Sequence, residues 1–308
     1  YVGGILEHIE MAGIHSGDSA CCTPPFSLSE AVQARLRSIA GRLALRLGVV
    51  GLLNVQFALK DSVIYVIEAN PRASRTVPFA SKARGVPLAK LAARVMAGEK
   101  LADLGLPPDD RRLDHYSVKE AVMPHGRFPG SDIVLGPEMR STGEVMGIAR
   151  NFPAAYLKSQ LAISYDLPSS GTAFLSVNDR DKREMVPIAR DIARLGFAIV
   201  ATAGTARALE AVGVPCEVVE KLHEGSGSIL ERIASGEVAF IVNTPLGSAT
   251  RDDGYELRMA AVRHGITCIT TVAGAQAMVE GMEVVRDGGL GIIALQDLPQ
   301  WEGEGRRA

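Results

Sequence analysis

The chain has 308 residues, enough for two ordinary domains, and hydrophobic residues make up 47% of it, which supplies material for packed cores. Its net charge is −2 and no basic stripe carries aromatic residues between its charges, so the sequence argues against a nucleic-acid partner. No apolar run reaches the ~18 residues that a membrane span needs, so we expect no membrane association.

The four cysteines form no CxxC pair, and two of them are adjacent. This pattern favours small buried side chains in a reduced, cytoplasmic protein over a zinc site or a disulfide framework. The first residues include neither a Met nor a signal peptide, and apolar strand-like sequence begins at once, so we interpret the chain as an interior segment of a longer protein. The cysteines are Cys21, Cys22, Cys216 and Cys268.

Residues 1–9 predict a strand, and residues 10–26, with their Gly and Pro residues, predict a loop. A helix is expected next, because Ser27 and Glu30 have the spacing of a capping box and apolar residues then recur at helical intervals. Gly48 supplies the end of this helix.

Two strands, Leu53–Leu59 and Val63–Ala69, are separated by three residues and predict a hairpin. Side chains alternate between the two faces of a strand, so the hairpin has an odd-numbered apolar face, which we expect to be the core face. We expect residue 55 to pair with 67 and residue 57 with 65, which places the even-numbered polar residues together. These are Asn54, Gln56, Glu68 and Asn70.

Further along, a helix is predicted from Pro87 to about Ala97, because Pro is favoured in a first helical turn. Residues 101–112 read as a polar linker and residues 113–150 as strands and turns. Residues 152–163 predict another helix.

After Pro168, apolar strands alternate with amphipathic helices, which predicts a parallel sheet covered on both faces. We therefore expect an α/β chain with domains at 1–165 and 166–308. The predicted strands are Ala173–Val177, Phe197–Thr202, Cys216–Val219, Val238–Asn243 and Thr267–Thr271, and the predicted helices are Lys182–Leu195, Thr205–Val212, Ser228–Ser235, Gly254–His264 and Ala275–Glu280.

The polar end of the hairpin offers one carboxylate and several amide oxygens, with no thiolate or histidine. Such hard donors suit Mg²⁺ or Mn²⁺, with nucleotide phosphates completing the coordination. Arg72 and Arg75 follow directly, and guanidinium groups match phosphate geometry, so the set suits phosphoryl transfer. The alternative is a solvent-facing strand face with surface arginines, and the pattern alone favours that alternative.

The literal strings change this balance. Asn54-Val55-Gln56-Phe57 followed by Glu68-Ala69-Asn70-Pro71-Arg72 resembles the ATP-grasp signature, and more closely the large chains of carbamoyl-phosphate synthases. The resemblance covers nearly the whole chain. It includes the strings Gly13-Ile14-His15-Ser16-Gly17-Asp18-Ser19, Arg75-Thr76-Val77-Pro78-Phe79, Tyr116-Ser117-Val118-Lys119-Glu120 and Leu135-Gly136-Pro137-Glu138-Met139-Arg140-Ser141-Thr142-Gly143-Glu144.

In that family, a large chain carries two ATP-grasp halves, of which the first phosphorylates bicarbonate and the second phosphorylates carbamate. A regulatory domain follows only the second half. The resemblance therefore implies the C-terminal part of the second ATP-grasp (α+β) domain, followed by a Rossmann-like, methylglyoxal-synthase-like domain. It implies a ligase that makes carbamoyl phosphate for pyrimidine and arginine biosynthesis, with this segment inactive alone. Implied partners are the remainder of the large chain and a glutaminase small subunit that docks elsewhere, in an oligomer of heterodimers.

The resemblance also implies site residues. Carbamate oxygen attacks the γ-phosphorus of ATP directly, so no side chain needs to be a covalent nucleophile. The implied metal ligands are Gln56, Glu68 and Asn70, the implied nucleotide-binding residues are Gly13, Ile14, His15 and Ser16 with Gln56 and Glu68, and the implied catalytic residues are Arg72 and Arg75.

In the second domain, threonines end three predicted strands, where helix N-termini form ready anion sites. Each Thr taken singly is an N-cap, but convergence with two lysines favours a ligand that carries phosphate. The resemblance implies an effector such as UMP or IMP, and we read the domain as regulatory because no carboxylate arrangement suits methylglyoxal synthesis. Pro245 stands where the family pocket can offer a hydroxyl. The candidate residues are Lys182, Thr202, Thr205, Lys221, Asn243 and Thr244.

Some family members also bind ornithine between the two domains. Glu10, Asp18, Glu120 and Thr270 match that site, although Cys268 replaces an aromatic residue there. The acids are alternatively partners at a surface or domain interface. Two alternatives to the main reading stay open: a module that only binds a nucleotide, and another ATP-grasp ligase such as a carboxylase. The parallel α/β domain argues against the carboxylase.

Overall fold

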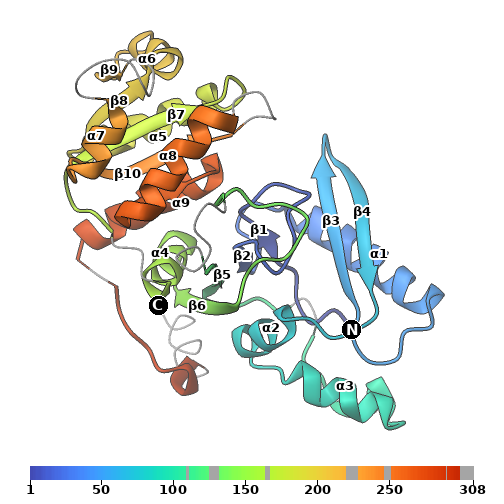
Figure 1. The fold of residues 1–308 in the computed structure, drawn as a ribbon. Coiled ribbons are helices and arrows are strands. Elements are labelled where there is room, and N and C mark those ends of the chain that lie inside the picture. Colours follow the sequence, from blue (N-terminus) through green and yellow to red (C-terminus); the bar gives the residue numbers. More distant parts are fainter. Residues whose placement is uncertain are drawn as a thin grey trace.

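The structure is a computed structural model that describes residues 1–108, 111–124, 132–163, 167–219, 228–245, 251–288 and 290–298, with the backbone alone at 251–253. Figure 1 shows a projecting hairpin, a small antiparallel sheet beside it, and a parallel sheet at the far end of the molecule. Within the described residues, no helix is both long and apolar enough to cross a membrane.

The antiparallel sheet has the strand order β1-β2-β5-β6. The strand expected over residues 1–9 is confined to two residues, and the predicted loop over 10–26 contains a short strand, so both expectations need correction. Cys21 and Cys22 are fully buried and pair with β5, a contact that flanking Gly and Pro residues conceal in the sequence. The strands are β1 (Glu7–His8), β2 (Cys21–Thr23), β5 (Tyr116–Val122) and β6 (Gly143–Ala149).

Helix α1 (Glu30–Arg46) begins later than the capping-box spacing indicated. Ser29, and not Ser27, is its N-cap, with Oγ accepting a hydrogen bond from Val32 N at 3.4 Å. Ser27 instead donates its backbone N–H to Oε2 of Glu7 at 2.8 Å. Gly48 follows the helix with a φ of +60°, as the predicted ending requires.

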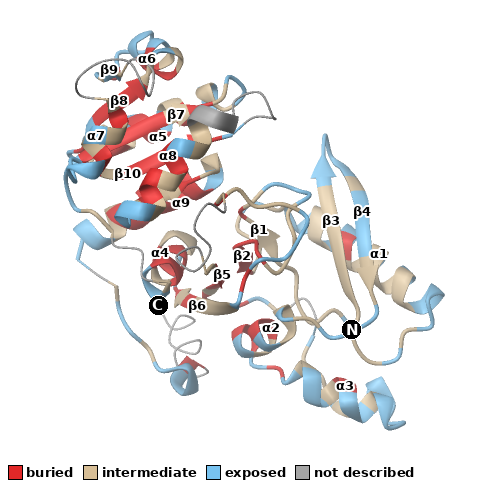
Figure 2. Cartoon of the chain, in the orientation of Figure 1, coloured by how far each residue is buried: buried red, intermediate tan, exposed pale blue. Residues whose placement is uncertain are grey.

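The hairpin consists of β3 (Asn54–Lys60) and β4 (Val63–Asn70). The expected pairing is wrong by two residues near the polar end: residue 55 pairs with 69 and not with 67. Residue 56 lies opposite 68, and a bulge follows it. At that end even-numbered residues still lie opposite even-numbered residues, so the polar residues share one face. The expected core face is also wrong: Leu59, Tyr65 and Ile67 are 45%, 50% and 52% exposed. Figure 2 shows this exposure along the outer part of the hairpin.

Helix α2 (Thr76–Arg84) was missed from the sequence. The helix predicted from Pro87 is present as α3 (Leu88–Met96), with Pro87 as its N-cap residue and not in its first turn. Pro78 lies in the first turn of α2, where no intrahelical partner is needed for its missing N–H. A 3₁₀ turn, η1 (Leu101–Leu104), lies in the expected linker.

The predicted helix over 152–163 is present as α4 (Phe152–Ala162), and it packs against β5, β6 and α9. It therefore belongs to both parts of the molecule, and one hydrophobic cluster runs through Cys22, Ala155 and Leu175. The approach of β6 to α4 is close, because a Cβ added at Gly147 would lie 2.1 Å from the carbonyl oxygen of Ala155.

The parallel sheet is confirmed, with the strand order β11-β10-β7-β8-β9. Alternate residues of its strands enter two separate clusters: Leu175 packs with α5, α6 and α9, whereas Phe174 packs with α7 and α8. The predicted boundary near residue 165 lies outside the described residues. The elements are β7 (Thr172–Val177), α5 (Lys182–Arg194), β8 (Ala198–Thr202), α6 (Ala203–Glu210), β9 (Glu217–Val219), α7 (Ile229–Ala234), β10 (Val238–Thr244), α8 (Arg251–His264), β11 (Thr267–Ile269), α9 (Val272–Arg286) and η3 (Leu295–Asp297).

Candidate functional site

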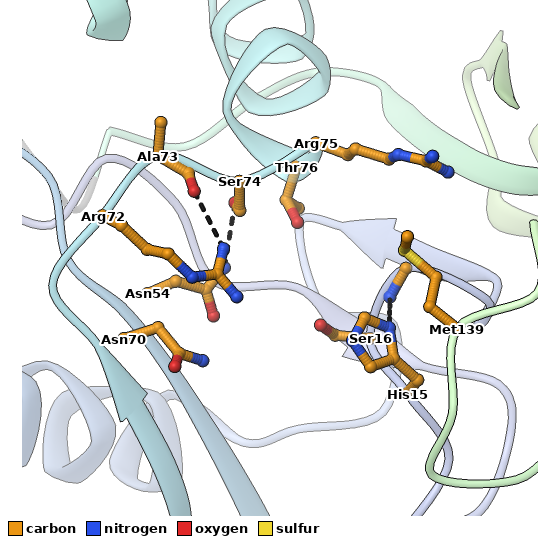
Figure 3. A pocket seen from close by; sticks show the side chains of 11 residues that line it. His15, Ser16, Asn54, Asn70, Arg72, Ala73, Ser74, Arg75, Thr76 and Met139 are labelled. Carbon is orange, nitrogen blue, oxygen red and sulfur yellow. Dashed lines mark hydrogen bonds between the residues drawn. The ribbon is translucent and has the colours of Figure 1, made fainter. Parts of the chain in front are cut away.

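An open pocket of about 520 Å³ lies where the polar end of the hairpin meets the loop before β2 and the start of α2. Figure 3 shows side chains from these three segments turned toward one space. The structure thus brings together five of the residues predicted from the sequence. The lining residues are His15, Ser16, Gly17, Asn54, Asn70, Arg72, Ala73, Ser74, Arg75, Thr76 and Met139.

The polar residues of the hairpin lie directly opposite one another, Asn54 across from Asn70 and Gln56 across from Glu68. The side-chain amides of Asn70 and Gln56 each donate a hydrogen bond within the protein. Nδ2 of Asn70 donates to Oε1 of Glu68 at 2.9 Å, and Nε2 of Gln56 donates to the carbonyl oxygen of Ile14 at 3.3 Å. Within the described residues the amide oxygens of Gln56 and Asn70 accept no hydrogen bond, which leaves them available as ligands.

This donor set suits a hard divalent cation. It combines the carboxylate of Glu68 with two amide oxygens, and it leaves several coordination positions for phosphate oxygens and water, as Mg²⁺ prefers. In the ranges that the structure describes, no three His, Cys, Asp or Glu side chains converge, so a metal here would rest on this mixed set. Gln56 and Glu68 do not line the pocket itself but lie beside Asn70 at its edge.

Two arginines and a helix terminus provide positive charge at the pocket. Arg75 is the N-cap residue of α2, so the first turn of that helix, with Thr76, opens toward the pocket. Helix N-termini favour anions because their backbone N–H groups lack intrahelical partners. Arg72 donates to the carbonyl oxygen of Ala73 at 2.9 Å, and Arg75 extends in a different direction (Figure 3).

The glycine-containing loop places a defined donor at the pocket. Nδ1 of His15 accepts a hydrogen bond from the backbone N–H of Gly17 at 3.0 Å. In the neutral ring the proton is therefore on Nε2, which can donate to a ligand. Gly13, with a φ of +102°, and Ile14 lie behind this point and do not line the pocket.

The second candidate site lies at the carboxyl edge of the parallel sheet. The chain leaves β7 toward β8 and returns through β10 on its other side, so the edge has a switch point between β7 and β10, where open α/β sheets bind ligands. Thr244 lies opposite Val177 across this point, and Thr202 ends the neighbouring strand β8. The strand ends therefore lie along one edge of the sheet, whereas their predicted convergence with two lysines stays a prediction.

At this edge most predicted polar side chains already have partners inside the protein. Oγ1 of Thr205 accepts from Val177 N at 3.1 Å, and Oγ1 of Thr244 accepts from Asn178 N at 3.1 Å. Asn243 donates to Ser176 O at 3.2 Å. Thr202 and Lys182 are more open, and Lys182 pairs with the exposed Asp179. Lys221 lies outside the described residues.

Asn178 and Arg258 were missed from the sequence. Asn178 joins the two sides of the switch point through Thr244, and the run Asn178-Asp179 directly after a strand was a usable signal. Arg258 on α8 is 1% exposed, which no local pattern indicates. Its guanidinium donates to Oδ1 of Asn243 at 2.8 Å and to both carboxylate oxygens of Asp132 at 2.7 and 2.6 Å.

Comparison with known proteins matches both parts of the chain. The family model for the carbamoyl-phosphate synthase L chain ATP binding domain matches residues 5–104, and the model for the MGS-like domain matches residues 184–270. A carbamoyl phosphate synthase large chain from Methanothermobacter thermautotrophicus is 51% identical over 306 residues, which cover 98% of this chain and 28% of that protein. The chain belongs to the carbamoyl phosphate synthase large-chain family.

Two other large-chain relatives give the same picture. The large chain of Pasteurella multocida is 51% identical over 305 residues, covering 97% of this chain and 28% of that protein. The C-terminal section of the large chain of Methanopyrus kandleri is 50% identical over 304 residues, covering 96% of this chain and 56% of that protein. This chain therefore spans between about a quarter and about half of these large-chain sequences.

Two of the residues predicted for ornithine, Glu10 and Glu120, are buried close together beside or on β5. Burial raises the pKa of Glu10, and the nearby carboxyl of Glu120 raises it further. Burial also raises the pKa of Glu120, although its Oε2 accepts a hydrogen bond from Gln160 at 2.5 Å. Asp18 is engaged differently, since both of its oxygens accept backbone N–H groups, and Thr270 lies just after β11.

Proposed function

We propose that this chain supplies the metal- and phosphate-binding part of an ATP site that phosphorylates carbamate to carbamoyl phosphate. The observation that carries the proposal is the pocket, which amide oxygens of the hairpin, arginines and a helix N-terminus line together, with the carboxylate of Glu68 beside Asn70 at its edge. An anionic nucleotide with a bound cation matches these groups.

In this proposal a carbamate oxygen attacks the γ-phosphorus of ATP, the bond to the β-phosphate oxygen breaks, and ADP leaves. Bound Mg²⁺ or Mn²⁺ would neutralise phosphate charge, held by Gln56, Glu68 and Asn70. Arg72 and Arg75 orient the transferred phosphoryl group and the carbamate, and Nε2 of His15 donates to the nucleotide. Catalysis then consists of positioning and charge stabilisation.

The activity belongs to the whole large chain in this proposal, because the family relatives are longer than this sequence. The remainder of the large chain would complete the ATP site. Ammonia would come from a glutaminase small subunit bound elsewhere, in an oligomer of heterodimers in the cytoplasm.

The test is Glu68→Ala in the full-length large chain. We expect carbamoyl phosphate formation to fall at least about a hundredfold, because one carboxylate supplies the only full negative charge of the proposed metal set. Glu99→Ala is the matched control, since Glu99 is exposed and pairs with Arg94 at the end of α3. A near-normal rate for Glu68→Ala would remove the metal assignment.

We also propose that the parallel-sheet domain is regulatory and binds a nucleoside monophosphate, UMP or IMP, at its carboxyl edge. The support is the switch-point position together with Lys182 above the first turn of α6, where a Cβ added at Gly204 would lie 3.0 Å from Nζ of Lys182. Calorimetry with UMP and IMP should show binding that weakens at least about tenfold in Lys182→Met. Lys90→Met on α3 is the control, and no heat with either nucleotide would overturn the pocket.

A third proposal concerns ornithine. Oε2 of Glu10 is buried and has no hydrogen-bond partner within the described part of the chain, and Glu120 lies beside it. Two buried carboxyls suit a cationic amino group, with Thr270 as a further contact. Ornithine should raise the melting temperature of the full-length protein, and Glu10→Gln should remove that shift. An equal shift in both proteins would exclude Glu10 from the site.

A further inference from the structure

Two loops interlock behind the pocket, and the contacts between them are not explained by metal or nucleotide binding. One contains residues 15–19 before β2, and the other contains residues 136–141 before β6. His15 N donates to Gly136 O at 2.9 Å, and Ser141 Oγ donates to Gly17 O at 3.1 Å. We infer that Ser141 and Asp18 are positioning residues that hold Arg75 in its catalytic orientation, an inference that rests on the proposed carbamate phosphorylation.

Arg75 is held by one residue that lies 66 positions away in the chain. Its Nη1 donates to both the carbonyl oxygen and Oγ of Ser141, each at 3.0 Å. Within the described residues Nε and Nη2 of Arg75 make no hydrogen bond, so these N–H groups stay available for phosphate or carbamate oxygens. Ser141 thus orients the guanidinium by one nitrogen and leaves the rest of the fork free.

Asp18 fixes the peptide that provides this contact. It is 1% exposed, and its two oxygens accept from the backbone N–H groups of Arg140 at 2.7 Å and Ser141 at 3.0 Å. A carboxylate that accepts from two successive N–H groups restrains the direction of the carbonyl that follows. Asp18 therefore acts on Arg75 through the backbone of Ser141.

The loop that carries Asp18 is itself held by hydrogen bonds from Lys119. Lys119 on β5 is 1% exposed, and its Nζ donates to Ser19 O at 2.6 Å and to Ser16 O at 3.4 Å. Gly17 is closely packed, because an added Cβ would lie 3.0 Å from Sδ of Met139 and 3.1 Å from Nδ1 of His15. Contacts through Ser141 and Asp18 thus connect Arg75 to β5, an inner strand of the antiparallel sheet.

This arrangement has a consequence for rate. A free arginine samples many rotamers, whereas an arginine held by one nitrogen keeps a single orientation before the substrate binds. Losing the Ser141 hydroxyl should reduce kcat for carbamoyl phosphate formation about tenfold, the effect of one hydrogen bond to a charged group. KM for ATP should change less than about twofold, because the nucleotide contacts remain.

The experiment uses the full-length large chain with Ser141→Ala, Ser141→Thr and Arg75→Ala. Ser141→Thr keeps the hydroxyl and should restore most of kcat. Thr142→Ala is the matched control, because the exposed Thr142 hydroxyl donates to Val122 O and does not touch Arg75. Asp18→Asn should lower kcat like Ser141→Ala.

The double variant separates positioning from a structural effect. If Ser141 acts through Arg75, Ser141→Ala should change the residual rate of Arg75→Ala by less than about twofold. An equal tenfold loss in both backgrounds would overturn the inference. A normal rate in Arg75→Ala would instead contradict the proposed function of Arg75, and a normal rate in Ser141→Ala beside an impaired Arg75→Ala would contradict the positioning role alone.

Discussion

The hairpin pocket and the carboxyl edge of the parallel sheet both gather polar side chains, but they use them differently. At the hairpin, Gln56 and Asn70 each donate an amide N–H to another group of the protein, and within the described residues their amide oxygens accept no hydrogen bond. At the edge, Asn243 has both ends of its amide engaged, by Ser176 and Arg258. The same residue type therefore offers ligand atoms in one region and stabilises the fold in the other.

The contrast follows from burial. Buried polar groups need partners, so Asn243, which is 6% exposed, is part of the packing of its sheet. Asn70 is half-buried at the end of a projecting hairpin, where water or a ligand can complete its hydrogen bonds. Matching a family motif residue by residue does not distinguish these situations, whereas exposure and hydrogen-bond partners do.

The largest expected effect tests whether the two regions are mechanically joined through α4. Gly147→Ala would place a Cβ 2.1 Å from Ala155 O and 2.6 Å from Ser159 N, which are backbone atoms that cannot move independently. We expect the helix to be displaced and the free energy of unfolding to fall by at least about 3 kcal/mol. Urea unfolding would measure this loss.

Gly143→Ala, on the same strand, is the control. Its Cβ would meet Val122 at 3.8 Å, which is ordinary contact, so stability should change little. If only one of two unfolding transitions shifted in Gly147→Ala, the regions would be independent and α4 would belong to one of them.

The next effect compares the two asparagines directly. Asn243→Ala removes the acceptor for Nη1 of the buried Arg258 and the donor to Ser176 O, so we expect a loss of about 2–3 kcal/mol in unfolding free energy. Asn70→Ala should reduce stability by less than about 1 kcal/mol while strongly lowering carbamoyl phosphate formation. Denaturant unfolding of both variants would measure the loss of stability, and initial rates would measure carbamoyl phosphate formation. Similar stability losses in both would contradict the distinction drawn between the two regions.

The smallest effect concerns pH. Burial, with the nearby Glu120, raises the pKa of Glu10 above its unfolded value, so folding favours the protonated form. That contribution is complete below the unfolded pKa and is lost as pH rises through the folded pKa. The protein should therefore lose stability between about pH 5 and pH 8, by roughly 1 kcal/mol or more from this group.

Glu10→Gln keeps the shape of the neutral acid and should flatten this pH dependence when urea unfolding is measured at pH 5 and pH 8. Glu30→Gln, at the exposed start of α1, should leave the pH profile unchanged. An unaltered profile in Glu10→Gln would show that another group is responsible.

Much of the fold was predictable because its signals are local. The alternation of apolar strands and amphipathic helices correctly predicted a parallel sheet, and strand parity correctly placed Gln56 and Glu68 on one face. The bulge after Gln56 was not predictable, since a register shift depends on how both strands twist and pair. Helix α2 was missed because Pro78 in its first turn reads as a helix breaker.

The chain by itself determined which residue types stand at its strand ends, and hence the donor groups that they offer: carboxylate and amide oxygens, followed by arginines, at the hairpin. Only the tertiary structure decided which of those side chains remain free. The deciding contacts join Arg75 to Ser141 across 66 positions, Asp18 to Arg140 across 122 and Asp132 to Arg258 across 126. Periodicity acts over a few neighbouring residues, whereas such contacts arise only when separate elements pack together.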